Sequence, residues 1–217
     1  MFQAPQLQEK IYRYKTSILI AVLIIFYLVG ITGLSLEAHR EDFLELTFMN
    51  LALSFTILLL GRTNHSKRFY AFAFFAFSVG MTVEWIGVHT GLLFGDYFYG
   101  ENLGFKLFEV PFIIGINWLM LTMISASVVQ YTKLHWLLKS VLAALLMLVL
   151  DLLIEPVAIT SDYWTWNGEI PISNFVTWFF IAFVLQWVYF KFKLAEKNKV
   201  AVSLYFLQFL FFLILNL

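Results

Sequence analysis

The sequence predicts an all-α fold, a polytopic membrane helical bundle with about seven transmembrane helices, and three observations support it. Of its 217 residues, 61% are hydrophobic and 13% are charged, and this charged share is about half that of a typical soluble domain. The apolar residues gather in runs near the length of about 20 residues that spans a bilayer. Basic residues fall in alternate loops between these runs. No linker divides the chain, so residues 1–217 are expected to form a single, multi-pass domain in the cell membrane.

Seven runs are candidate spans. The first follows a short mixed segment and is not followed by a small-residue cleavage site, so it is predicted to be a membrane helix and not a signal peptide. In chain order the predicted spans are Ser17–Leu34, Phe43–Leu60, Phe69–Val88, Leu107–Gln130, Trp136–Pro156, Ser173–Phe192 and Val200–Leu217.

The orientation follows from the basic residues, because cytoplasmic loops carry an excess of Lys and Arg. Four segments hold nearly all of them: Lys10, Arg13 and Lys15; Arg62, Lys67 and Arg68; Lys133 and Lys139; and Lys191, Lys193, Lys197 and Lys199. The alternate loops carry only Arg40 and Lys106. The N-terminus is therefore predicted to be cytoplasmic.

Acidic residues inside the third and fifth spans are the first functional candidates, because an intramembrane carboxyl is costly and usually functional. Glu84 shares a helical stripe with Gly80, Gly87 and Gly91, and small residues there let a neighbouring helix approach closely. Glu84 is therefore expected to face the bundle. A structural carboxyl bonded to a neighbouring helix is the alternative interpretation.

Asp151 and Glu155 lie four residues apart on one face of the fifth span. Two carboxyls one turn apart in a medium of low dielectric do not both ionise easily, so one is expected to act as an acid beside a charged neighbour. Pro156 is expected to end this helix. The alternative is that Glu155 caps the loop or faces water.

Further candidates lie at the same end of the predicted bundle. Glu109 precedes Pro111 at the start of the fourth span, where an acid also complements the helix dipole. Asn117, deeper in that span, fits a hydrogen bond between helices. Tyr163, Trp164 and Trp166 are typical of the membrane interface, or they line an apolar pocket and stabilise a cation.

Composition excludes several function classes. The chain has no cysteine and a net charge of zero, which removes thiolate chemistry and any general attraction to nucleic acid. The four histidines, His39, His65, His89 and His135, match no metal-binding spacing, and no nucleotide fingerprint is present. We therefore expect neither a metal nor another cofactor.

The order of these motifs resembles that of the membrane carotenoid biosynthesis family whose members are carotenoid 1,2-hydratases, of the bisanhydrobacterioruberin and γ-carotene hydratase type. The resemblance rests on Glu84-Trp85 and on five longer stretches: Thr90–Gly104, Val110–Trp118, Asp151–Ala158, Tyr163–Trp166 and Ile170–Trp178. Together they cover roughly half of the chain.

The resemblance implies an enzyme that adds water to the terminal double bond of a ψ end group by carboxylate acid–base catalysis, giving a tertiary alcohol. Its substrate would be a lipophilic carotenoid in the bilayer, and other enzymes of the carotenoid pathway are candidate partners. A membrane isomerase resembling lycopene cyclases and a proton-coupled transporter are the alternatives. The candidate catalytic residues are Glu84, Asp151, Glu155 and Glu109, and the candidate substrate-binding residues are Trp85, Tyr97, Tyr99, Trp118, Trp164, Trp166, Asn174 and Trp178.

Overall fold

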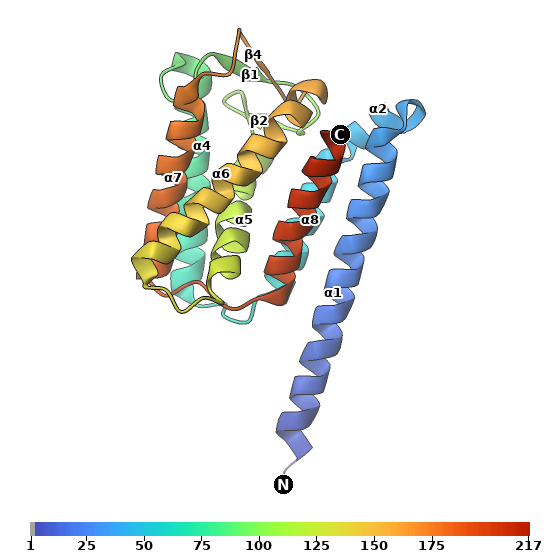
Figure 1. Ribbon diagram of the computed structural model, residues 1–217, viewed down its shortest axis with the longest axis vertical. Helices are drawn as coiled ribbons and strands as arrows, with labels where there is room; N and C mark the ends of the chain where they lie inside the picture. Colours follow the sequence, from blue (N-terminus) through green and yellow to red (C-terminus); the bar gives the residue numbers. More distant parts are fainter. Residues whose placement is uncertain (1–2) are drawn as a thin grey trace.

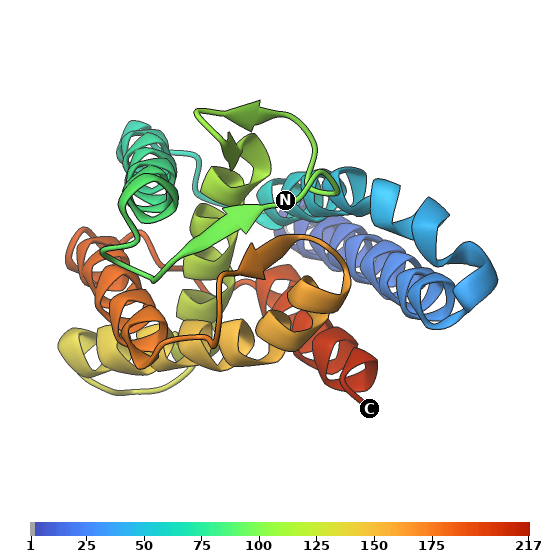
Figure 2. The ribbon, with the colours of Figure 1, turned by 90° about the horizontal axis from the view of Figure 1, so that it is seen from above.

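Helix α5 (Phe112–Val129) lies at the centre of the protein, whose computed structural model describes residues 3–217. Other helices surround it, as the view from above shows (Figure 2). Its sequence is apolar on every side, which is the pattern of a helix buried all round. The remaining helices thus pack around one apolar core element.

The surrounding helices are long, and they lie side by side in the bundle (Figure 1). Their bounds are α1 Gln3–Ser35, α4 Lys67–Thr90, α6 Trp136–Thr160, α7 Ile172–Lys191 and α8 Lys199–Leu215. α1 extends well beyond the bundle at its N-terminal end (Figure 1). Within residues 3–217, five helices are long and apolar enough to cross a membrane. This confirms the predicted all-α polytopic bundle.

The second and seventh predicted spans differ from the other five. The second is bent by 59° where α2 (Arg40–Glu45), which follows the short helix η1 (Glu37–His39), meets α3 (Thr47–Gly61). Counting this bent pair as one span gives six spans in the described part of the chain. The seventh predicted span is α8, a shorter helix of 17 residues. Its length is about 26 Å, slightly less than the roughly 30 Å hydrocarbon core.

Two predicted helix ends are wrong. The fourth span does not begin at Leu107, because β2 (Lys106–Leu107) and β3 (Val110–Pro111) form a small antiparallel hairpin before α5. Pro156 does not end the fifth span, because α6 continues to Thr160. The Thr160 hydroxyl donates to the carbonyls of Pro156 and Val157, both at 3.1 Å, and packing against α7 and β4 supports the final turns.

A two-stranded sheet crosses one end of the bundle (Figures 1 and 2). β1 (Tyr97–Tyr99) pairs antiparallel with β4 (Trp164–Trp166), so that Tyr97 faces Trp166 and Tyr99 faces Trp164. Alternate side chains of a strand point to the same side, and the outer residue Phe98 is exposed while Tyr97 and Tyr99 are buried. The pairing therefore turns two tyrosines and two tryptophans towards the bundle.

Candidate active site

Glu84 is buried on the side of α4 that faces α5, with only 3% of its surface exposed. Glycines above and below it permit close approach of aromatic rings. A Cβ atom at Gly80 would lie 2.7 Å from the Trp118 ring, and one at Gly87 would lie 2.8 Å from the Tyr97 hydroxyl. The glycine stripe thus lets Trp118 of the neighbouring helix α5 approach Glu84, as the spacing predicts, and it also admits Tyr97 of β1.

Three donors converge on the Glu84 carboxyl. The hydroxyls of Tyr97 and Tyr99 donate to Oε2 at 2.6 and 2.7 Å, and Trp118 Nε1 donates to Oε1 at 2.9 Å. Burial raises the pKa of both tyrosines, and the neighbouring charge of Glu84 raises it further. Both hydroxyls therefore keep their protons and can serve as donors.

Glu155, near the end of α6, also binds three donors. Trp164 Nε1 and Trp166 Nε1 donate to Oε2 at 3.0 and 3.1 Å, and Asn174 Nδ2 donates to Oε1 at 3.1 Å. The two indoles come from β4 and the amide comes from the first turn of α7. The strand pairing of β1 with β4 therefore sets donors around Glu84 and Glu155 at once.

Asp151 lies one turn before Glu155 on α6 and is 1% exposed. Its Oδ2 atom is buried and has no hydrogen-bond partner in the described part of the chain. Asp151 thus differs from its two acidic neighbours, each of which has a complete set of donors. Among residues whose side chains are described, these three are the buried acids.

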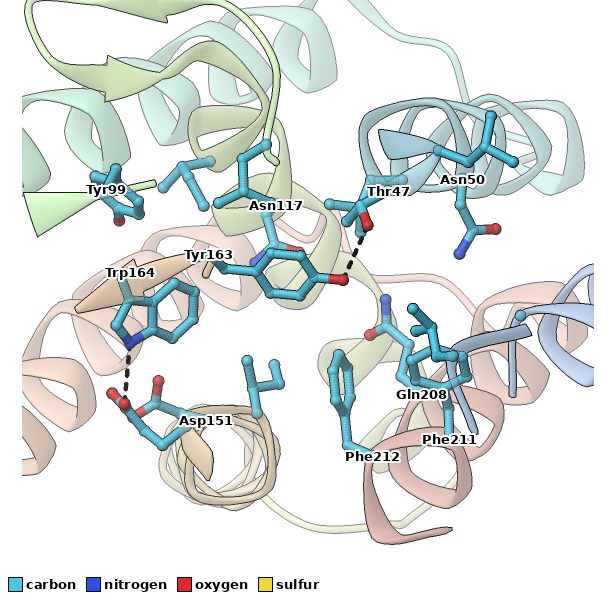
Figure 3. A pocket seen from close by; sticks show the side chains of 18 of the residues that line it. Thr47, Asn50, Tyr99, Asn117, Asp151, Tyr163, Trp164, Gln208, Phe211 and Phe212 are labelled. Carbon is cyan, nitrogen blue, oxygen red and sulfur yellow. Dashed lines mark hydrogen bonds between the residues drawn. The ribbon is translucent and has the colours of Figure 1, made fainter. Parts of the chain in front are cut away.

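All three carboxyls line one cavity of ≈ 490 Å³. Trp118 and Trp178 stack in its wall, with ring centroids 3.9 Å apart. Figure 3 shows Asp151 and Trp164 on one side of the pocket and Gln208, Phe211 and Phe212 on the other. We call the side with the carboxyls the acidic end.

The other side of the cavity, which we call the apolar arm, lies between α1, α3 and α8. Phe26 and Val29 of α1 and Met49 of α3 line it and are exposed. Two amides interrupt the apolar lining, and Figure 3 shows Asn50 of α3 and Gln208 of α8 directed across the pocket towards each other. Asn50 Oδ1 and Gln208 Oε1 are buried without a partner among residues 3–217.

The structure brings most of the predicted site residues together. Three of the four candidate acids and seven of the eight candidate substrate-binding residues line the cavity: Glu84, Asp151, Glu155, Tyr97, Tyr99, Trp118, Trp164, Trp166, Asn174 and Trp178. Asn117 also lines it. Trp85 does not, because it lies on the outer side of α4, 46% exposed and packed on His89.

Glu109 lies outside the cavity, at the turn of the β2–β3 hairpin. Phe108 and Glu109 occupy this turn with positive φ angles of 52° and 67°, which directs the chain outward before α5 begins. The Glu109 side chain is 72% exposed, and its Oε2 lies 3.4 Å from His89 Nε2. Helix α5 starts only at Phe112, so Glu109 is not in its first turn.

We therefore expect Glu109→Gln to keep most of the activity of the protein. An exposed ion pair contributes about 0–1 kcal/mol, and the side chain does not reach the cavity. Product yield and protein accumulation should both stay within a few fold of wild type. A loss as large as that of a cavity carboxyl would place Glu109 in the reaction.

Sequence reasoning missed the polar residues of the apolar arm. Thr47 accepts or donates a 2.9 Å hydrogen bond with the Tyr163 hydroxyl, while Asn50 and Gln208 face each other. Thr47 and Asn50 lie three positions apart in the largely apolar helix α3, and Gln208 lies in the middle of the apolar helix α8. An amide inside the last apolar run was the available signal for Gln208, because such groups usually face other helices.

Among the side chains that the structure describes, no three from His, Asp or Glu gather in a way that could hold a metal ion. Comparison with known proteins adds one further finding. Residues 43–217 match the family model described as carotenoid biosynthesis protein. No curated protein and no solved structure matches the chain. The matched region contains every carboxyl and aromatic ring of the acidic end, whereas α1 lies entirely before it.

Proposed function

The chain belongs to the carotenoid biosynthesis protein family, and from this premise we propose that it is a carotenoid hydratase. It adds water to the terminal double bond of a ψ end group and forms a tertiary alcohol. One observation carries the proposal: three buried carboxyls lie at the acidic end of a largely apolar cavity, beside tryptophan and tyrosine rings. The bilayer supplies the lipophilic substrate.

The acidic end has the groups that hydration of an alkene needs. A carboxyl group transfers its proton to the less substituted alkene carbon, and the positive charge develops on the tertiary carbon. Negative carboxylates and the faces of aromatic rings stabilise that charge. A water oxygen then bonds to the cation, and the proton it releases goes to a carboxylate. The sum is one alkene and one water giving one tertiary alcohol.

Unpartnered polar atoms in the cavity favour hydration over cyclisation. Asp151 Oδ2, Asn50 Oδ1 and Gln208 Oε1 are buried acceptors without a partner in the described residues, and polar sites of this kind hold ordered water in protein cavities. A cyclase must keep water away from its cation so that an internal double bond captures it. The lining of this cavity therefore suits water as the nucleophile.

A proton-coupled transporter fits less well. Its acids would need to form a path from one side of the membrane to the other. Here the buried acids of the described side chains all lie at one end of the bundle. Below them, α5 fills the centre with apolar residues from Leu119 to Ile124, apart from Thr122.

The test is expression in a host that makes acyclic carotenoids with ψ ends, followed by mass analysis of the pigments. We expect a new pigment heavier by one water, with its oxygen drawn from isotopically labelled water in the medium. Host cells without the gene are the control. A product of unchanged mass with an altered absorption spectrum would indicate cyclisation, and an unchanged pigment profile would contradict a pigment-modifying role.

A further inference from the structure

The three carboxyls of the cavity differ in the number of hydrogen-bond donors around them. This difference indicates which of the carboxyls are ionised and which is protonated. An indole N–H can only donate a hydrogen bond. Two indoles donate to the same oxygen of Glu155, and Asn174 donates to the other. Both oxygens of Glu155 thus act as acceptors, which is the bonding of an ionised carboxylate.

Glu84 is bound in the same way. Trp118 occupies Oε1 as an obligatory donor, and the hydroxyls of Tyr97 and Tyr99 both point to Oε2. Hydrogen bonds that donate to a carboxylate favour its charged form. Three such bonds at each of two glutamates therefore favour the charged form of both.

Asp151 shares the cavity with these two glutamates, and no donor to its carboxyl group is found in the described part of the chain. It is buried, and its Oδ2 is unpartnered in residues 3–217. The ionisable groups that line the cavity with it are Tyr27 from α1, Glu84 from α4, Glu155 from α6, Tyr97 and Tyr99 from β1, and Tyr163. None of these can carry a positive charge. A buried, unpaired carboxylate is so unfavourable that the group takes up a proton instead.

We propose that Asp151 is the proton donor of the site, held as a neutral acid in the same cavity as the ionised carboxylates of Glu84 and Glu155. This division of roles rests on the proposed hydratase function. Asp151 gives its proton to the alkene carbon, and the cation forms beside two anions. The water that adds to the cation releases its proton to the Asp151 carboxylate, which is the one without donors and hence the strongest base. The site then returns to its starting state.

The protonation state can be measured without any enzymatic reaction. The full chain in lipid nanodiscs is examined by infrared spectroscopy for the carbonyl stretch of a protonated carboxyl, identified by its shift in deuterium oxide. Four variants are compared with wild type: Asp151→Asn, Glu84→Gln, Glu155→Gln and, as the matched control, Glu169→Gln. Glu169 is an exposed carboxyl in the loop before α7.

We expect the band at neutral pH in the wild type, in the Glu169→Gln control and in both cavity glutamate variants, and its loss only in Asp151→Asn. A band that survives in Asp151→Asn and disappears in a glutamate variant would overturn the assignment. So would the absence of any such band from the wild type.

Activity gives the second readout. Asp151→Asn should lower hydration by about 10²–10⁴-fold, the usual contribution of a general acid, while the protein accumulates normally. Full activity of this variant would overturn the proposal even if the band behaves as expected. If the wild type hydrates no acyclic carotenoid, the hydratase function itself fails, and the infrared result still decides whether Asp151 is the neutral acid.

Discussion

Replacing Glu155 with glutamine is expected to lower hydration by about 10²–10³-fold, the loss typical of removing one group that stabilises developing charge. Glutamine keeps the shape of the side chain and removes its charge. The amide oxygen can still accept from Trp164 and Trp166, and the amide nitrogen can donate to Asn174 once that amide turns over. The contacts therefore survive while the cation loses a neighbouring anion.

The measurement compares product formation at equal amounts of membrane-inserted protein, with Glu169→Gln as the control. A normal thermal transition together with a large loss of product supports an electrostatic role. Activity close to that of wild type would show that the charge of Glu155 does not serve the reaction. Failure to accumulate would show that Glu155 is needed for folding.

The gathering of Glu84, Asp151 and Glu155 is predictable from sequence because helix period and bilayer depth both constrain it. Glycines at spacings of three and four place Glu84 towards a neighbouring helix. The alternation of spans then puts the C-terminal halves of the third and fifth helices at one level. Two periodic patterns thus suffice to bring three acids to one end of the bundle.

The donors around these acids are not predictable in the same way. Tyr97 and Trp166 are 69 positions apart, and their approach depends on the register of β1 with β4. Both strands are only three residues long, so neither carries a periodic signal. Trp164 and Trp166 are typical of a membrane interface by composition alone, and only the pairing shows that their N–H groups reach Glu155.

The errors at Glu109 and Pro156 have a common cause. Both predictions apply a rule for an isolated helix end: proline belongs to the first turn or follows the last one. In the structure the hairpin holds the chain extended up to Pro111, and α6 continues through Pro156 because α7 and β4 pack against its last turns. Contacts between segments override the local preference in both cases.

The apolar arm leads to a second large effect, because a polyene attached to the reacting end group must leave the acidic end through it. Gly30 of α1 lines this arm, and a Cβ there would lie 3.2 Å from the Phe211 ring. We expect Gly30→Phe to place its ring in the arm. If the ring displaces even two CH₂ groups of the substrate, the binding free energy weakens by about 1.6 kcal/mol. Each factor of ten in affinity corresponds to about 1.4 kcal/mol, so the variant should bind the polyene more than tenfold more weakly.

Binding is measured as quenching of tryptophan fluorescence by the polyene, since Trp118 and Trp178 lie in the cavity wall. The matched control is Leu28→Phe, which adds an aromatic ring to an exposed side of α1 that does not line the cavity. A short terpenoid with the same isopropylidene end should still be hydrated by Gly30→Phe. The short molecule does not extend into the apolar arm, so the added ring does not displace it. Equal loss with short and long substrates would indicate a disturbed fold, and unchanged binding of the long substrate would show that the polyene takes another route.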